Sequence, residues 1–406
     1  MADFESFGMG WEKLLDQVGA QNALRHSIEN DRVSHAYLFF GPDGSGKRAA
    51  ALLFAQSLLC LNRAAGQADP CETCAACLKV KRMTHPDVHF LMPYPGEDPP
   101  DDFRKRLDML AVEPYRTLDY SRRPSIDDLS QTSNKQTIYE VRRVHDELIR
   151  EMSFRPVEGS YKIAIITDAD RLQKAGANAF LKRLEEPFAD TIFILLTVRP
   201  DRLLPTIVSR TQKVQFDRIA TDTIARYLTS IGTDASDAAL ISRMSDGSLS
   251  RAIDLADHSE LRSGREVVVD FLRVSFVDDA DATEEAVRLL AGQGREQVKL
   301  YLQLLLAWIR DLLILRQTGD ESTLVNVDQI DAIRSFVAKL PDADVARMVS
   351  LIEEGLHLVE RNVNATSVLR SLGIGLRDAM KGRPGGNLYQ PLARTSSGFV
   401  AKSALA

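Results

Sequence analysis

The period of the hydrophobic positions changes near residue 217. Before that point, short runs of consecutive apolar residues alternate with amphipathic segments. After it, apolar positions recur every three to four residues. Short apolar runs are typical of buried parallel strands, and the longer spacing is typical of helices. The pattern predicts an α/β domain with a parallel sheet, followed by helical domains.

Five apolar runs are predicted to be the strands of this sheet. They span residues 36–40, 88–92, 163–167, 191–197 and 213–216. The first run leads through a glycine-rich loop into a predicted helix. Between the second and third runs lies a different stretch, rich in proline and charge, which we interpret as a surface insertion covering about residues 93–133.

The second half of the chain is predicted to be helical throughout. Residues 221–257 form a small helical domain in this interpretation, and residues 266–380 form longer amphipathic helices. Along one of these, an apolar stripe around Trp308 is predicted to be helix core rather than a ligand site. The tail after residue 382 has few large apolar residues and is predicted to be disordered.

The glycine-rich loop has the sequence and position of a phosphate-binding P-loop, between a strand and a helix. Backbone N–H groups of such a loop, together with the start of the next helix, favour an anion. A glycine-rich turn with no link to phosphate is the alternative. The residues predicted to cradle phosphate are Gly41, Gly44, Ser45, Gly46, Lys47 and Arg48.

Two positions that ATP hydrolysis requires are changed. Residue 48 is Arg where the motif places the Ser or Thr that ligates Mg²⁺. Asp168 ends the third predicted strand, where a Walker B acidic residue belongs, but the catalytic Glu expected next is Ala169. Asp170 is a weak substitute base. These changes leave binding of ATP or ADP open and predict that the chain does not hydrolyse it.

All four cysteines of the chain lie in one short region. Cys71, Cys74 and Cys77 are spaced by two residues each, and Cys60 ends the helix upstream. In a reducing compartment, such a cluster indicates metal binding before disulfides. Four thiolates are the ligand set of a closed, structural Zn²⁺ site. We predict a zinc module at about residues 60–80, with free thiols or an iron–sulfur cluster as alternatives.

The overall charge and hydropathy exclude some functions. With a formal net charge of −6, the chain is not expected to coat DNA by electrostatic attraction. The sequence shows neither a membrane-spanning run nor a secretory signal, so a cytoplasmic location is predicted.

Taken together, these motifs resemble the clamp-loader subunits of bacterial DNA polymerase III, and within that family the delta-prime type. The resemblance covers roughly residues 15–260. It implies an AAA+ subunit with a nucleotide-binding domain, a helical lid and an all-α collar that assembles a ring. The segments that carry it are residues 34–39, the four cysteines, and residues 168–172, 177–187 and 205–210. The implied boundaries are 1–217, 218–262 and 263–382, with the tail at 383–406.

The resemblance also assigns roles to single residues. Ser209-Arg210-Thr211 matches a Ser-Arg-Cys motif, except at its third position. In that family the arginine reaches the ATP site of a neighbouring subunit as an arginine finger. Thr197 matches a sensor position. Ser250 stands where catalytic relatives have a second sensor arginine, and Arg251 is one position late, a turn of about 100° on a helix.

The implied function is therefore that of a non-catalytic subunit of the DNA polymerase III holoenzyme, which helps load the sliding clamp onto primed DNA. The implied partners are gamma/tau-type and delta-type subunits, the sliding clamp and primer-template DNA. Two alternatives remain open. One is an active ATPase of the gamma/tau type, against which Arg48, Ala169 and Ser250 argue. The other is a zinc-dependent AAA+ DNA-binding protein outside the loader.

Overall fold

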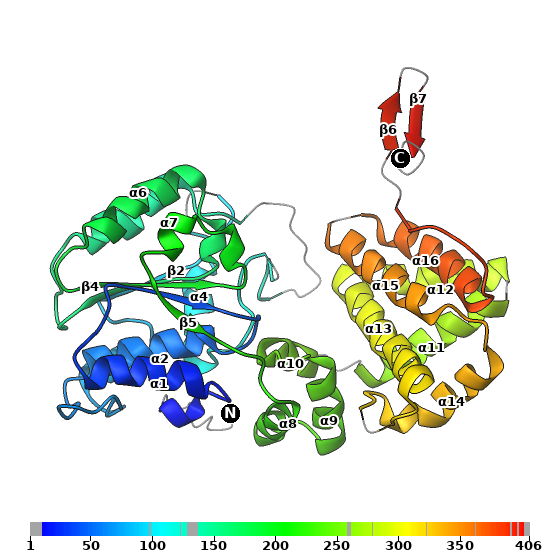
Figure 1. Ribbon diagram of the computed structural model, residues 1–406, viewed down its shortest axis with the longest axis horizontal. Helices are drawn as coiled ribbons and strands as arrows, with labels where there is room; N and C mark the ends of the chain where they lie inside the picture. The colour runs from blue at the N-terminus through cyan, green and yellow to red at the C-terminus, as the bar shows by residue number, and fades with distance from the viewer. Residues whose placement is uncertain are drawn as a thin grey trace. The chain divides into compact units, whose positions relative to one another are not determined.

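The computed structural model divides the chain into two compact units, Met1–Asp257 and His258–Ala406 (Figure 1). Among the helices that it describes, none combines the length and apolar character needed to cross a bilayer. The structure describes residues 10–96, 99–121, 123–127, 137–257, 261–277, 279–321, 323–361, 363–389, 392–395 and 398–401.

The first unit is built on a five-stranded parallel sheet with the order β2-β3-β4-β1-β5. The prediction of a parallel sheet is confirmed, and the observed strand bounds lie within one residue of those expected. Because all strands are parallel, the segments that follow β1, β3 and β4 meet at one edge of the sheet. The strands are β1 (Ala36–Phe40), β2 (Val88–Leu91), β3 (Lys162–Ile166), β4 (Thr191–Thr197) and β5 (Gln212–Gln215).

Helices cover both faces of this sheet (Figure 1). Along β1, successive side chains point to opposite faces, so Tyr37 and Phe39 join one core and Leu38 joins the other. The first core includes α1 (Val18–Glu29) and α2 (Lys47–Leu59). The remaining short elements are η1 (Trp11–Lys13), α3 (Ala75–Lys81), α5 (Val141–Arg143), η2 (Val144–Arg150), η3 (Ala169–Arg171), α6 (Lys174–Glu185), η4 (Pro200–Arg202) and α7 (Pro205–Val208).

The predicted surface insertion is a folded element in its described part. Residues Phe103–Val112 form helix α4, and the chain after it packs back against the helix. Arg106 is fully buried, donates to the carbonyls of Leu118, Arg123 and Pro124, and lies 3.8 Å over the Tyr120 ring. The sequence predicted a surface insertion but not this folded part, in which one buried guanidinium satisfies backbone groups that would otherwise need water. Residues 97–98, 122 and 128–133 lie outside the described residues.

Three helices that follow the sheet belong to the same unit. They are α8 (Thr221–Ser230), α9 (Ala235–Met244) and α10 (Leu249–Ala256). The start of α10 touches the P-loop, since the Leu249 N–H donates to the Gly44 carbonyl at 3.1 Å. The division of this region into a nucleotide-binding domain and a lid stays a prediction.

The second unit is helical, as the sequence predicts. The apolar stripe is buried at Leu300, Leu304, Trp308 and Leu312, so it is helix core. The tail was expected to be disordered, but residues Leu392–Thr395 and Gly398–Ala401 pair as the hairpin β6–β7; residues 390–391, 396–397 and 402–406 lie outside the description. The helices are α11 (Leu261–Val277), α12 (Ala280–Gly292), α13 (Arg295–Thr318), η5 (Val327–Gln329), α14 (Ile330–Lys339), α15 (Val345–Glu360) and α16 (Ala365–Met380).

Candidate functional site

The P-loop connects β1 to α2 in a conformation that requires glycine. Gly41, Gly44 and Gly46 have φ angles of 143°, 67° and 96°, which side chains rarely allow. A Cβ added to Gly44 would lie 2.1 Å from the Ser248 hydroxyl. The glycines predicted from sequence therefore shape the loop and let the start of α10 approach it.

Lys47 is turned into its own loop. Its ammonium donates to the Gly41 carbonyl at 2.9 Å, to the Pro42 carbonyl, and to the Ser45 hydroxyl at 3.3 Å. The Ser45 hydroxyl in turn donates to Pro42 at 2.8 Å. These contacts hold the Lys47 ammonium against the backbone of its own loop.

Arg48 lies at the first turn of α2 and points to the folded insertion. Its Nη2 atom donates to the backbone carbonyl of Arg116 at 2.8 Å. A guanidinium has no lone pair to offer a cation. This geometry agrees with the expectation that position 48 does not ligate Mg²⁺.

A cavity of about 60 Å³ lies where the P-loop, the strand ends and α10 meet. Of the predicted residues, Gly41 and Ser45 lie in the loop but do not line it. Its lining combines predicted residues with others, namely Asp43, Gly44, Gly46, Lys47, Arg48, Phe90, Met92, Pro114, Tyr115, Asp119, Thr167, Asp168, Leu196, Thr197, Val198 and Ser250.

The end of β3 presents one carboxylate to this cavity. Asp168 lines it, whereas Ala169 is fully buried in the core between the sheet and α6. Asp170, the weak candidate for a substitute base, accepts a hydrogen bond from the Thr197 hydroxyl at 2.6 Å. Asp170 itself does not line the cavity, so Asp168 is the one acid among the described residues that this strand end contributes to the lining.

Helix α10 places Ser250, and not Arg251, at the cavity. The Ser248 hydroxyl accepts from the Arg251 N–H at 3.3 Å and caps the helix. Ser250 is 2% exposed, and its hydroxyl donates to the Tyr115 carbonyl. The one-residue offset expected from the sequence is thus real, because the residue after Ser250 points elsewhere on the helix.

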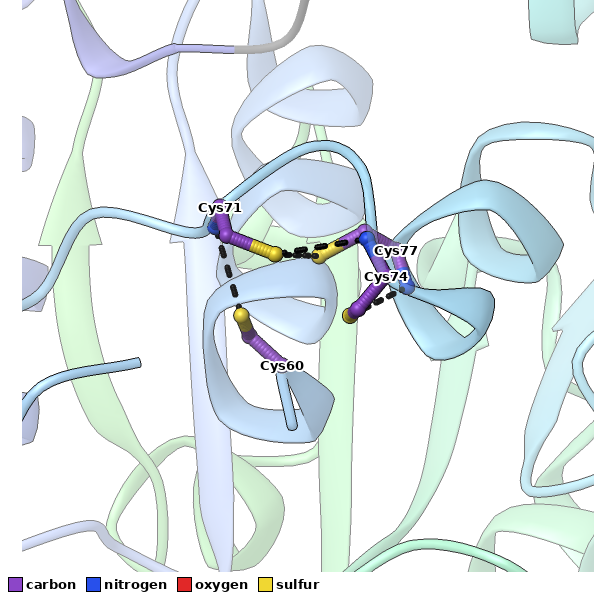
Figure 2. Close-up of side chains that lie close together, drawn as sticks. All are labelled: Cys60, Cys71, Cys74 and Cys77. Carbon is purple, nitrogen blue, oxygen red and sulfur yellow. Dashed lines mark hydrogen bonds between the residues drawn. The ribbon is translucent and has the colours of Figure 1, made fainter. Parts of the chain in front are cut away.

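The four cysteines converge on one point between the end of α2 and the start of α3 (Figure 2). Their sulfur atoms all lie within 4.8 Å of one another, and Cys71 and Cys77 are 4.0 Å apart. Tetrahedral Zn–S bonds of about 2.3 Å place sulfurs about 3.8 Å apart. The arrangement therefore fits one metal ion bound by four thiolates, with no ligand position left open.

Backbone N–H groups stabilise negative charge on these sulfurs. Cys60, Cys71 and Cys74 accept from the N–H groups of Cys71, Cys74 and Cys77 at 3.2–3.4 Å. Burial of the Cys71 thiol opposes ionisation, but N–H bonds from Thr73 and Cys74 outweigh it and lower its pKa to about 6. A thiol that ionises near neutral pH is ready to bind a metal, whereas burial raises the pKa of Cys60 and Cys77, so a metal would have to displace their protons.

Arg210 lies away from the cavity, between α7 and β5. Its Nη2 atom pairs with the Glu185 carboxylate at 2.8 Å, and Nη1 donates to the Thr206 carbonyl at 3.1 Å. The side chain is 37% exposed. An arginine-finger role requires a neighbouring subunit, and the ion pair with Glu185 holds the guanidinium at the surface meanwhile.

Sequence reasoning missed the contribution of the insertion to this site. Pro114, Tyr115 and Asp119 line the cavity, although they come from a segment interpreted as a surface loop. One signal was present: tyrosines at 115 and 120 are unusual in a stretch that otherwise reads as solvated. Aromatic residues of this kind usually find a core to pack in.

Comparison with known proteins gives a consistent set of similarities. The sequence model described as "DNA polymerase III, delta subunit" matches residues 17–220. The delta' subunit of Bacillus subtilis DNA polymerase III is 28% identical, with 91% of this chain and 99% of that protein covered. The tau subunit of the same organism is 26% identical, and the chain spans 57% of its length. A solved gamma-subunit-related protein of Thermotoga maritima is similar over 89% of this chain and 99% of its own, with 15% identity and a TM-score of 0.39.

Proposed function

Since the chain belongs to the DNA polymerase III delta subunit family, we propose that it is a non-catalytic AAA+ subunit of the clamp loader. In this role it assembles with gamma/tau-type and delta-type subunits into a ring. The ring loads the sliding clamp onto primer-template DNA. The resemblance to delta-prime subunits predicted from sequence motifs is confirmed by these relatives.

One observation carries the non-catalytic part of the proposal. Three positions lack the groups that hydrolysis requires: Arg48 and Ser250, which line the cavity, replace the Mg²⁺ ligand and the second sensor, and the buried Ala169 replaces the base. Each residue already has a structural role, in a hydrogen bond or in the core. Reverting one of them would therefore not restore the others.

Arg210 supplies the catalytic contribution of this subunit in our proposal. Phosphoryl transfer develops charge on equatorial oxygens, and a guanidinium placed there stabilises the transition state. Arg210 follows α7 on the surface, where a partner can reach it. In the assembled ring, the Arg210 guanidinium leaves its ion pair with Glu185 and binds the phosphates of the ATP in the neighbouring subunit.

We also propose that the four cysteines hold Zn²⁺ in a structural role. The sulfur separations and the N–H bonds to three sulfurs support this ligand set. The ion would tie the end of α2 to α3. Iron–sulfur ligation uses the same residues, and elemental analysis separates the two.

The remaining parts of the proposal concern the whole subunit. We assign residues 1–217 to the nucleotide-binding-type domain, 218–262 to the lid and 263–382 to the collar. We place the protein in the cytoplasm, where its partners in replication act. The amphipathic helices of the second unit support a role in assembly.

An active ATPase of the gamma/tau type is the second candidate, favoured by the tau relative. The retained Lys47 and Asp168 are compatible with it. The three changed positions argue against it.

Reconstitution tests the proposed function. The chain is mixed with gamma/tau-type and delta-type subunits, and clamp loading onto primed DNA is measured with and without it. We expect a stable complex that loads clamps only when the chain is present. Failure to join the complex, or loading at an equal rate without the chain, contradicts the proposal and favours a role outside the loader.

A further inference from the structure

Residues 113–120, here called the cleft segment, occupy the mouth of the P-loop cleft. Tyr115 is 2% exposed, and its ring lies against the loop, since a Cβ added to Gly46 would meet the Tyr115 hydroxyl at 3.0 Å. The Tyr115 hydroxyl accepts from the Leu15 N–H at 3.3 Å. A side chain of the chain itself thus fills space beside the phosphate loop.

The cleft segment bonds to two of the three positions at which the nucleotide machinery is changed. The carbonyl of Arg116 accepts from Arg48, and the carbonyl of Tyr115 accepts from Ser250. A Thr at 48 or an Arg at 250 would not make these bonds in the same way. The substitutions therefore do more than remove catalytic groups, because each of them holds the same piece of backbone.

The cleft segment also holds the helices α8–α10. Glu113 accepts from the Tyr227 hydroxyl on α8, and Arg116 pairs with Asp257 after α10 at 2.8 Å. The Tyr115 and Tyr227 rings lie 6.4 Å apart. Contacts therefore run from the P-loop through the cleft segment to both the first and the last of these helices.

Other residues of the insertion hold the cleft segment in place. Arg106 donates to the Leu118 carbonyl at 2.8 Å, and Tyr120 donates to Asp102 at 2.8 Å. Leu118 is fully buried with Leu110 and Ile126. These contacts make the cleft segment a packed part of the first unit and not a loose peptide in an open groove.

We propose that the cleft segment is a built-in occupant of the nucleotide cleft, which excludes Mg·ATP and holds α8–α10 against the P-loop without nucleotide. The inference rests on the proposed function only in treating the P-loop as that of a loader subunit. It assigns a role to the insertion. It also predicts that the orientation of α8–α10 does not depend on ATP or ADP.

Calorimetric titration of the full chain with Mg·ATP tests the exclusion. We expect no binding up to about 1 mM for the unchanged chain and for Val112→Ala, an exposed position in the same insertion. The variant Tyr115→Ala/Ser250→Ala should bind at least tenfold more tightly than that limit. A micromolar Kd for the unchanged chain overturns the proposal. So does a folded double variant whose residues 113–120 exchange amide hydrogens rapidly but which still does not bind.

Amide hydrogen exchange on the unchanged chain provides a second test that needs no variant. We expect slow exchange at residues 115–120 and in α10, with the same rates in the presence and absence of 5 mM Mg·ATP. Faster exchange in the cleft segment on addition of Mg·ATP shows displacement and overturns the proposal. Both tests use the isolated chain, so their outcome does not depend on reconstitution of the loader. The cleft can exclude Mg·ATP in a chain that fails to join the loader, and a chain that joins the loader can still bind Mg·ATP.

Discussion

Arg48 combines a loss and a gain in one side chain. Its guanidinium removes the hydroxyl that a P-loop uses for Mg²⁺, and it holds the carbonyl of Arg116 at 2.8 Å. A hydrogen bond from a charged donor is worth about 1.5–3 kcal/mol. Arg48, which we expect to prevent Mg²⁺ ligation at this position, therefore also stabilises the folded insertion.

Replacement of Arg210 by Ala tests the arginine finger. In a reconstituted loader we expect normal assembly, lower DNA- and clamp-stimulated ATPase activity, and slower clamp loading. A finger is worth roughly 10³–10⁵ in rate at the site it completes. The total rate should fall by less, because only one site of the ring depends on this arginine.

Glu185→Gln is the matched control for Arg210. It removes the ion pair that Arg210 makes within its own chain but leaves the guanidinium in place. If the ion pair is the only role of Arg210, the two variants should behave alike. The finger hypothesis requires the ATPase rate of Glu185→Gln to stay near that of the unchanged loader.

Asp87 is predicted to make stability dependent on pH. Its carboxylate is fully buried and accepts the N–H groups of Val157, Glu158 and Gly159 at 2.6–2.8 Å. Burial raises its pKa, but the three N–H bonds outweigh burial and hold the pKa below the ordinary 3.8. A lowered carboxylate pKa stabilises the fold above the ordinary value, and this contribution is lost as pH falls through the folded-state pKa.

The variant Asp87→Asn should therefore lower the free energy of unfolding by about 2 kcal/mol at pH 7. The loss should shrink when urea denaturation is repeated below pH 3.8. Asp108→Asn, at an exposed ion pair, should cost at most about 1 kcal/mol. An equal loss from Asp87→Asn at both pH values would show that shape, and not charge, is what the site needs.

At the level of elements, the cysteine module joins helices α2 and α3, which also pack together in the core through residues such as Leu58 and Val80. Cys60 follows α2, whereas Cys74 caps α3 and Cys77 lies within it. A metal ion that binds all four thiolates ties these helices together. Bound metal adds to folding free energy, because the unfolded chain does not hold the ligands together.

Cys74→Ser should reduce zinc content and stability together. We expect elemental analysis to find about one zinc per unchanged chain and far less in the variant. The free energy of unfolding should fall by about 3 kcal/mol or more, since loss of a metal is among the severe single changes. Lys79→Ala, on the same helix and in an exposed ion pair with Glu158, should leave the zinc content unchanged. Metal-free protein with rapidly reacting thiols would refute the zinc site.

Over the whole molecule, the cleft depends on elements far apart in the sequence. Residues from the P-loop, the ends of β3 and β4, the insertion and α10 line one small cavity. The three positions that depart from the catalytic pattern, 48, 169 and 250, lie on three separate elements of the chain. We therefore expect that no single substitution would give the chain ATPase activity.

We expect the purified chain to hydrolyse ATP far more slowly than about one turnover per second, the low end of ordinary enzyme rates. Any residual rate should be the same in Lys47→Ala, because a rate that does not depend on Lys47 comes from contaminating ATPases. Turnover near one per second that disappears in Lys47→Ala would show an active site and favour the gamma/tau-type alternative.

Local sequence determined the strands of the sheet and the motifs of this protein. Strands such as Ala36–Phe40 are short apolar runs, and their burial on both faces follows from that pattern. The glycines of the P-loop and the spacing of the cysteines are local as well. Each of these signals lies within a few residues, so the sequence alone was enough to find them.

The tertiary structure decided how the insertion is used. Its proline and charged residues suggested a solvated loop, yet Arg106 is fully buried and Tyr115 lies beside Gly46. A guanidinium can be buried only when distant carbonyls satisfy its N–H groups, and those partners come from Leu118, Arg123 and Pro124. Likewise, Ser250 bonds to Tyr115 across 135 positions of the chain. Pairings of this kind follow from packing in three dimensions, which the spacing of residues along the chain does not specify.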